Sequence, residues 1–205
     1  MSELFYRLRS TDVLAWPEAL QMIAWQMPWK SLALAWDPET ARISREDTCP
    51  DTAPTDLFPK LAVKSWQEGG RLRLIPEGLP LAAAVDARLA TPTRQQQVAL
   101  QAWNDADAPP CLHLFPWRDM SRISEARFAW SGGQISLKSL CVRNSVAFSA
   151  DEFTQACALI AECIPVLDSF VAQFVIDETG SKRLLDVNPV LTQREIDTLW
   201  PLEAG

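Results

Sequence analysis

The stretch RLLDVNPV, residues 183–190, joins an apolar run to an acid, an amide and a proline. Side chains of a β-strand alternate between its two faces, so we expect Asp186 and Asn188 on one face and Leu185 and Val187 on the other. A carboxylate and an amide side by side offer oxygen ligands to a hard cation. The same two residue types are also common in turns, where they cap the backbone. The stretch therefore predicts a strand that ends in either a cation-binding pair or a capped turn.

Composition limits the classes of protein to which this chain can belong. Its 205 residues are enough for one domain with a core or for two small lobes, and 48% apolar with 22% charged residues is an ordinary globular profile. The formal net charge of -7 disfavours a nucleic-acid partner bound through phosphate contacts. The N-terminus lacks the pattern of a signal peptide, and no apolar run has the length of a membrane span. We therefore expect a cytoplasmic protein with neither a nucleic-acid nor a membrane partner.

Tryptophan and cysteine usage narrow the possibilities further. Four of the nine tryptophans fall in the first forty residues, which fits either a partner-binding surface or a core built from large side chains. The five cysteines are widely spread, form no CxxC pair and share the chain with a single histidine, His113. Structural zinc is therefore not expected, and free thiols in a reducing compartment are the simplest account.

Periodicity and turn chemistry predict an α+β fold. Glycines in SGGQ (131–134) predict a hairpin, and Ser149 with Glu152 three residues later matches a helix-capping box. We expect mainly antiparallel sheets with helices packed on one face. The helices are expected at 11–27, within 79–104 and from 149 onward, and the strands at 31–36, 41–44, 71–75, 111–117, 125–130, 135–142, 170–176 and 183–189.

Five short motifs, taken in order, resemble the cell division cycle 123 family, which has an ATP-grasp fold. They are FPKL (58–61), L-x-L-x-x-W (112–117), E-x-R-F (125–128), the FV that opens the last hairpin, and LDVNP (185–189). The resemblance covers about residues 58 to 201. It predicts an ATP-grasp-like domain at 58–205, preceded by a tryptophan-rich segment at 1–57.

The resemblance implies a function and roles for six residues. The family implies binding of ATP with Mg²⁺, and either a ligase-like activity that joins a carboxylate to an amine or an ATP-dependent role in assembling a translation initiation factor. Matched to its motifs, Asp186 and Asn188 would bind the metal. Arg127 would contact phosphate and act in catalysis. The other residues expected to bind the nucleotide are Lys60, Lys64 and Lys138.

The physical properties of these residues fit those roles but do not require them. Arginine presents a fixed fork of donors to phosphate oxygens, and lysine supplies a point charge. Arg127 could equally pair with a surface carboxylate or stack on an indole, and Lys60 and Lys64 could simply be solvated.

One departure from the family opens a second hypothesis. Family members carry a second acid on the strand before the last turn, where this chain reads FVAQF (170–174) and has Gln173 instead. Glutamine is neutral and is a poor substitute for a carboxylate at a magnesium site. The alternative function is therefore a degenerate ATP-grasp protein that binds a protein partner, as an immunity or inhibitor protein does.

Overall fold

The computed structural model describes residues 3–50, 56–61, 64–65, 80–90, 92 and 94–190. The chain divides into two compact units. The first unit comprises residues 1–5, 28–117 and 191–205, and the second comprises residues 6–27 and 118–190. The first 57 residues thus contribute to both units, and the separation of an ATP-grasp-like domain at residue 58 stays a prediction. Within the described part, no helix is long and apolar enough to cross a membrane.

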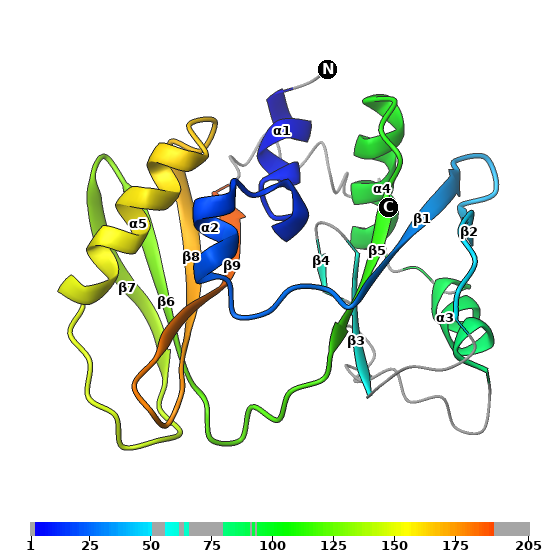
Figure 1. Ribbon diagram of the computed structural model, residues 1–205. Helices are drawn as coiled ribbons and strands as arrows, with labels where there is room; N and C mark the ends of the chain where they lie inside the picture. The colour runs from blue at the N-terminus through cyan, green and yellow to red at the C-terminus, as the bar shows by residue number, and fades with distance from the viewer. Residues whose placement is uncertain are drawn as a thin grey trace, which may run out of the picture. The chain divides into compact units, whose positions relative to one another are not determined.

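The first unit is a five-stranded antiparallel sheet in the order β2-β1-β5-β3-β4, with α3 and α4 (Figure 1). Alternate leucines of its strands, including Leu32, Leu61 and Leu112, are fully buried in one cluster with Leu81 and Val85 of α3. The strands are β1 (Lys30–Asp37), β2 (Arg42–Arg45), β3 (Leu57–Leu61), β4 (Lys64–Ser65) and β5 (Cys111–Pro116), and the helices are α3 (Leu81–Leu89) and α4 (Arg94–Asp105).

His113 lies on the sheet face opposite that leucine cluster, because its strand neighbours Leu112 and Leu114 point into the cluster. Its side chain is buried, and its Nδ1 lies 2.8 Å from the hydroxyl of Ser31, its cross-strand partner. This is the environment expected of a structural histidine.

The second unit is a four-stranded antiparallel sheet in the order β7-β6-β8-β9, and Figure 1 shows α5 and α2 lying across it. The α+β class with mainly antiparallel sheets is therefore confirmed. Its strands are β6 (Ser124–Ser131), β7 (Gln134–Cys141), β8 (Ser169–Ile176) and β9 (Lys182–Pro189), and its helices are α1 (Glu3–Arg9, which begins in the first unit), η1 (Val13–Ala15), α2 (Glu18–Ile23) and α5 (Asp151–Cys163).

Local sequence signals account for the ends of these elements. Gly132 and Gly133 have φ of 57° and 79°, and these positive angles suit the two-residue turn between β6 and β7. Half of the expected capping box is present: the Ser149 backbone N–H donates to the Glu152 carboxylate at 2.8 Å, but the Ser149 hydroxyl accepts the Asp151 N–H at 3.3 Å instead of the Glu152 N–H. The hydrogen bond to the Glu152 carboxylate is the main cause that lowers the pKa of Glu152, and Lys182 adds to it.

An aromatic cluster forms the core between α5 and the sheet. Phe153 of α5 stacks on Phe128 of β6 with ring centroids 4.7 Å apart, and it also contacts Phe174 of β8 at 4.9 Å. Phe148 meets Phe153 edge-on at 5.5 Å. Beside this cluster, burial raises the pKa of the Cys157 thiol to about 12, so the thiol stays protonated at neutral pH.

Two expectations differ from the structure. Residues 11–27 are not one helix: Asp12 caps the short η1 through the Leu14 N–H at 2.9 Å, and the chain turns at Trp16 before Pro17 precedes α2. Proline has no N–H and fixes φ, which suits a helix start but not its interior. The expectation that Leu185 shares a face with Val187 is also wrong. The register of β9 shifts at Leu185, and Leu184 is buried with Val187 instead. The predicted strand at 71–75 lies outside the described residues.

We predict that Phe153→Ala destabilises the second unit by about 3–5 kcal/mol, because it removes a fully buried ring at the centre of the aromatic cluster. Urea unfolding followed by tryptophan fluorescence measures this loss. Leu159→Ala, at a half-buried position of the same helix, is the control and should cost far less. An equal loss in both variants would contradict the central role of Phe153.

A second prediction concerns the ion pair that joins β2 to α3. Arg45 donates two hydrogen bonds to Asp86, at 2.6 and 2.8 Å, and these lower the pKa of Asp86. A carboxyl group whose pKa is lower in the folded than in the unfolded protein stabilises the folded state at pH values above its unfolded-state pKa. This stability is lost as the pH falls through the folded-state pKa. Arg45→Met should therefore cost stability at pH 7, by less than about 1 kcal/mol because Asp86 is half exposed. Urea titrations should show this difference shrinking below about pH 4. A pH-independent difference would contradict this account.

Candidate functional site

Three side chains form a row across the sheet of the second unit. Arg127 of β6 lies opposite Gln173 of β8, and Gln173 lies opposite Asp186 of β9. Directly opposed residues of antiparallel strands share a face, so all three lie on the face away from the aromatic cluster. Asn188 lies opposite Val171 on the same face. The expectation that Asp186 and Asn188 point the same way is therefore confirmed.

Two β-bulges flank this row. Lys138 is the extra residue of β7, because Arg127 pairs with Ser139 while Phe128 pairs with Leu137. Leu185 is the extra residue of β9, because Gln173 pairs with Asp186 while Phe174 pairs with Leu184. Bulges re-aim side chains locally and are frequent beside functional sites. Both bulges here fall at the level of the row that the sequence marks as a candidate site.

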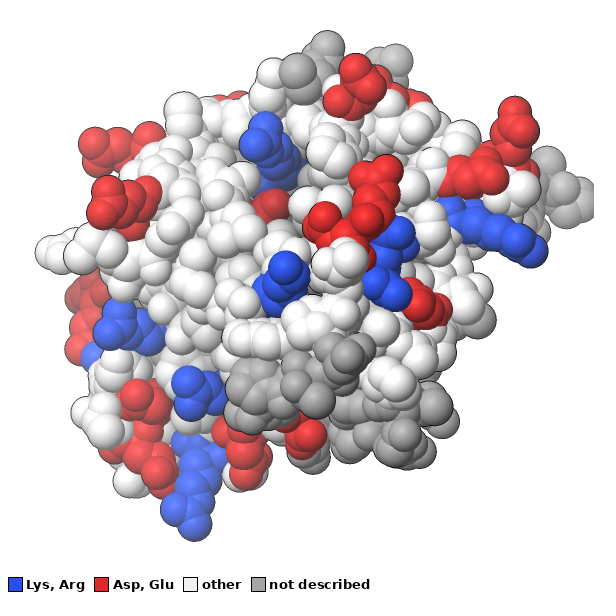
Figure 2. Space-filling view, turned by 45° about the vertical axis from the view of Figure 1, so that its right-hand side comes forward, with Lys and Arg blue, Asp and Glu red and all other residues white. Residues whose placement is uncertain are grey.

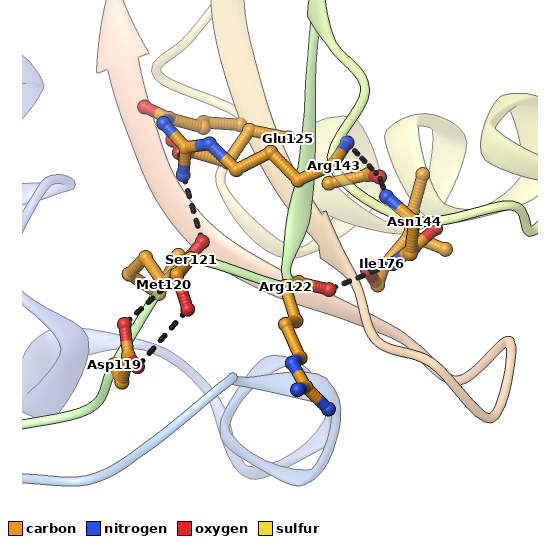
Figure 3. A network of polar contacts seen from close by, with 10 residues as sticks. Asp119, Met120, Ser121, Arg122, Glu125, Arg143, Asn144 and Ile176 are labelled. Atoms are coloured by element: carbon orange, nitrogen blue, oxygen red, sulfur yellow. Dashed lines mark hydrogen bonds and ion pairs between the residues drawn. The ribbon is translucent and has the colours of Figure 1, made fainter.

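Glu125 joins the row through a polar network. Its carboxylate accepts a hydrogen bond from the Gln173 amide at 2.7 Å and forms an ion pair with Arg143 at 2.9 Å. The Arg143 guanidinium also donates to the Met120 carbonyl at 3.0 Å, as Figure 3 shows. The Glu125 charge is therefore already compensated by Arg143 and by the Gln173 amide.

Hydrogen bonds hold the loop after β7 next to this network. The hydroxyl of buried Ser124 accepts hydrogen bonds from the N–H groups of Arg143 (2.9 Å) and Asn144 (3.3 Å). The Asn144 amide donates to the carbonyls of Arg122 (3.0 Å) and Ile176 (2.9 Å), so it ties the segment before β6 to the end of β8 (Figure 3). These contacts hold the backbone from which the Arg143 side chain reaches Glu125.

Arg127 and Asn188 are exposed, and neither side chain has a hydrogen bond or ion pair to any residue that the structure describes. Asp186 is half buried, and its carboxylate accepts the Val187 N–H at 3.0 Å. The row thus combines an uncompensated guanidinium with one carboxylate and one amide oxygen. An arrangement of this kind can attract an anion and supply part of a cation's ligand shell.

The oxygen donors fit Mg²⁺ only in part. Among the described residues, no group of three or more His, Cys, Asp or Glu side chains could hold a metal ion. Mg²⁺ is commonly held by one or two carboxylates together with substrate phosphates and waters. The pair of Asp186 and Asn188 fits a metal that arrives with a phosphate and does not form a site for the ion alone.

The three predicted lysines lie on different elements. Lys138 is exposed on β7 of the second unit. Lys60 lies on β3 of the first unit, on the same face as His113 and half buried, and Lys64 lies on β4 of that unit. The assignment of all three to a nucleotide site stays a prediction.

Sequence reasoning missed the role of Glu125 and Arg143. Glu125 was visible only as the first residue of the E-x-R motif, and Arg143 only as a basic residue after β7. Arg143 and Gln173, the partners of Glu125, are 18 and 48 residues away along the chain, so no local pattern could have joined them. Only the strand register reveals the network.

The expectation that the chain has no nucleic-acid partner stays a prediction, and Figure 2 shows only how charge is distributed over one face. In Figure 2, acidic and basic side chains of the described residues are interspersed over the visible face. Nucleic-acid-binding surfaces usually gather Lys and Arg on one face. The face shown has no such concentration among these residues.

Comparisons with known proteins were made at three levels. No family model and no curated protein matches the chain. Similar solved structures include Cdc123 from Schizosaccharomyces pombe, with 16% identity over 97% of this chain and 93% of that chain and a TM-score of 0.47. Another is the ATP-grasp ligase PsnB with precursor peptide PsnA2 and AMPPNP, with 16% identity over 90% and 52% and a TM-score of 0.40.

A third is N5-carboxyaminoimidazole synthetase from Staphylococcus aureus complexed with ADP, with 11% identity over 89% and 45% and a TM-score of 0.42. The chain spans about half the length of the two enzymes. Identities of at most 16% with TM-scores of at most 0.47 establish neither a family nor an activity for this chain.

We predict that Gln173→Glu destabilises the protein at neutral pH by about 1–2 kcal/mol, because it sets a second carboxylate against Glu125. Repulsion raises the pKa values of the pair, so the lost stability should return as pH falls through them. Millimolar Mg²⁺ should also restore stability in this variant. Urea unfolding with and without Mg²⁺ measures both effects.

Gln173→Met is the matched control, because it removes the hydrogen bond without adding charge. It should show neither recovery in acid nor recovery with Mg²⁺. Equal stability of Gln173→Glu and the unaltered protein at every pH would contradict the contact between Gln173 and Glu125.

Proposed function

We propose that this chain binds a nucleoside triphosphate, ATP in the first instance, together with Mg²⁺, and that the exposed face of the β7-β6-β8-β9 sheet contacts its phosphates. The observation that carries the proposal is the row of Arg127, Gln173 and Asp186, with Asn188 beside it. Two of the motifs that resemble the cell division cycle 123 family, E-x-R-F and LDVNP, contribute Arg127, Asp186 and Asn188 to this row, whereas FPKL and L-x-L-x-x-W lie in the first unit. The strand register supports the proposal, because it brings these four side chains to one face of the sheet.

Each residue of the row has a distinct part in this proposal. The uncompensated Arg127 guanidinium donates to phosphate oxygens, and Lys138, the bulge residue beside it on β7, adds positive charge. Asp186 and Asn188 supply oxygens to the metal. Mg²⁺, when bound, would neutralise phosphate charge. Lys60 and Lys64 lie on the first unit, and their part in nucleotide binding is a proposal that rests on the family resemblance alone.

In this proposal the residues act by positioning and electrostatics, and no protein nucleophile is needed. If the chain is an enzyme, ligase-like chemistry that activates a carboxylate fits such a site, with Arg127 as the catalytic group that stabilises phosphate charge. The similar proteins include ligases crystallised with ADP or AMPPNP. A cytoplasmic location, where ATP and Mg²⁺ are available, is part of the same proposal.

A second candidate function is a protein-binding module with a degenerate ATP-grasp frame. The observation that favours it is the hydrogen bond from Gln173 to Glu125. Glu125 is also paired with Arg143, so Asp186 is the one carboxylate of the row that could serve a metal. In that case the protein acts by masking a partner, as an inhibitor or immunity protein does.

Calorimetric titration of ATP, with and without Mg²⁺, tests the proposed function. We expect binding that requires Mg²⁺, a loss of roughly 10- to 100-fold in affinity for Arg127→Met, and a loss of the Mg²⁺ dependence for Asp186→Asn. Arg122→Met and Asp151→Asn are the matched controls, because both residues are exposed and lie outside the row. They should leave binding unchanged.

The opposite result is equally informative. If millimolar ATP with Mg²⁺ gives no heat and no thermal shift, the nucleotide proposal is wrong and the protein-binding candidate takes its place. Binding that is equally weakened by Arg122→Met and Arg127→Met would place the nucleotide elsewhere on the protein.

A further inference from the structure

The two edges of the second unit's sheet differ. At the β9 edge, the Trp25 N–H donates to the Leu184 carbonyl at 2.7 Å, and Ala24 forms a parallel bridge with Leu184. At the opposite edge, β7 pairs with β6 alone among the described residues. An unpaired edge presents a row of backbone donors and acceptors to any strand that can add to it. Among the described residues, the β7 edge is therefore open to another strand along its whole length, whereas the β9 edge is bonded at Leu184.

The side chains of β7 make this edge unusually apolar for its exposure. Leu137 is 50% exposed, Leu140 is 43% exposed, and Val142 just beyond the strand is 61% exposed. The bulge at Lys138 brings Leu137 and Leu140 onto one face, because Leu137 pairs with Phe128 and Leu140 pairs with Ala126, both of them buried. The apolar side chains therefore line the face of the sheet that α5 covers.

The sequence of this edge is palindromic in polarity. Residues 135–142 read ISLKSLCV, in which apolar and polar positions repeat in reverse about the boundary between Lys138 and Ser139. If a second copy of β7 is laid antiparallel about that boundary, Leu137 lies opposite Leu140 of the copy, and Ile135 lies opposite Val142. Lys138 then lies opposite Ser139 and not opposite another lysine. Directly opposed apolar pairs stabilise a sheet, and directly opposed like charges destabilise it.

The bulges do not disturb this register. Each β7 strand carries one extra residue, and in the two-fold arrangement the two bulges fall at the same level. An isologous interface needs a surface that is complementary to itself. The β7 edge meets that requirement in its polarity, in the placement of its one charge and in the position of its bulge.

We propose that the β7 edge docks a second copy of this chain, and that two copies pair antiparallel about the Lys138–Ser139 boundary to form one continuous eight-stranded sheet. The assembly closes at two copies, because the pairing is isologous and uses the β7 edge of each copy. Interfaces of small area are weak, so we expect a concentration-dependent dimer.

A register-specific disulfide tests the proposed pairing in the full-length protein. Ser136 lies directly opposite Cys141 of the second copy, and both face away from α5. Directly paired Cα atoms lie about 4.5–5.5 Å apart, which suits a disulfide. Ser136→Cys should therefore yield an oxidised dimer linked between positions 136 and 141, as mapped by peptide mass spectrometry. Within one chain these positions are about 15 Å apart and cannot be joined.

Gln134→Cys is the matched control, because its position is diagonal to Cys141 of the copy, at roughly 7–8 Å, which is too far for a disulfide. It should form far less of the oxidised dimer. Disulfides that join 136 to 136 or 141 to 141 would overturn the register, and equal cross-linking of both variants would overturn the pairing.

Sedimentation velocity from micromolar to millimolar protein provides a measurement without cross-linking. We expect reversible dimerisation, weakened by roughly 100-fold in Leu137→Glu, since each of two symmetric sites loses about tenfold. Leu14→Glu, at an exposed leucine outside the edge, is the control and should dimerise normally. A monomer at every concentration, or equal weakening in both variants, would overturn the proposal. Circular dichroism would show that each variant is folded.

Discussion

The register of β8 between β6 and β9 is the constraint on which the second unit depends. It turns Phe128 and Phe174 toward α5 and turns Arg127, Gln173 and Asp186 away from it. A slip by one residue would exchange the two faces, since side chains alternate with a period of two. Burying a phenylalanine is worth about 1.5–3 kcal/mol, and burying an unpaired guanidinium costs several kcal/mol. The aromatic core thus fixes where the candidate site lies.

The sequence predicted those elements that local chemistry determines. The glycine turn at 132–133, the capping contact of Ser149 with Glu152 and the strands on either side of them follow from residue types a few positions apart. The helix expected at 11–27 failed because its apolar spacing outweighed Pro17 in the prediction, although proline more often begins a helix than continues one. The bulges at Lys138 and Leu185 could not be predicted, because a bulge is a relation between two strands and neither strand shows it alone.

Part of the candidate site could likewise be predicted from local sequence, and part of it required the strand register. Asp186 and Asn188 could be placed on one face from the strand period alone, and Gln173 could be placed near them from the order of the motifs. The contact of Gln173 with Glu125 and the pairing of Glu125 with Arg143 required the register, since these residues come from three different segments. The network also changes the interpretation of the motif. In E-x-R-F, the arginine is exposed while the glutamate is bound within the protein.

The same network explains why an amide at position 173 is compatible with this sheet. A carboxylate there would face the Glu125 carboxylate at hydrogen-bonding distance, and the two could share the position only with a bound proton or a bound cation. The Gln173 amide donates instead, so the Glu125 carboxylate has the amide and the Arg143 guanidinium as its partners. The charged residues of the row that lie outside this network are then Arg127 and Asp186, one of each sign. A face with one charge of each sign does not concentrate negative charge for a divalent cation, and for this reason the proposed ligand combines the metal with a phosphate.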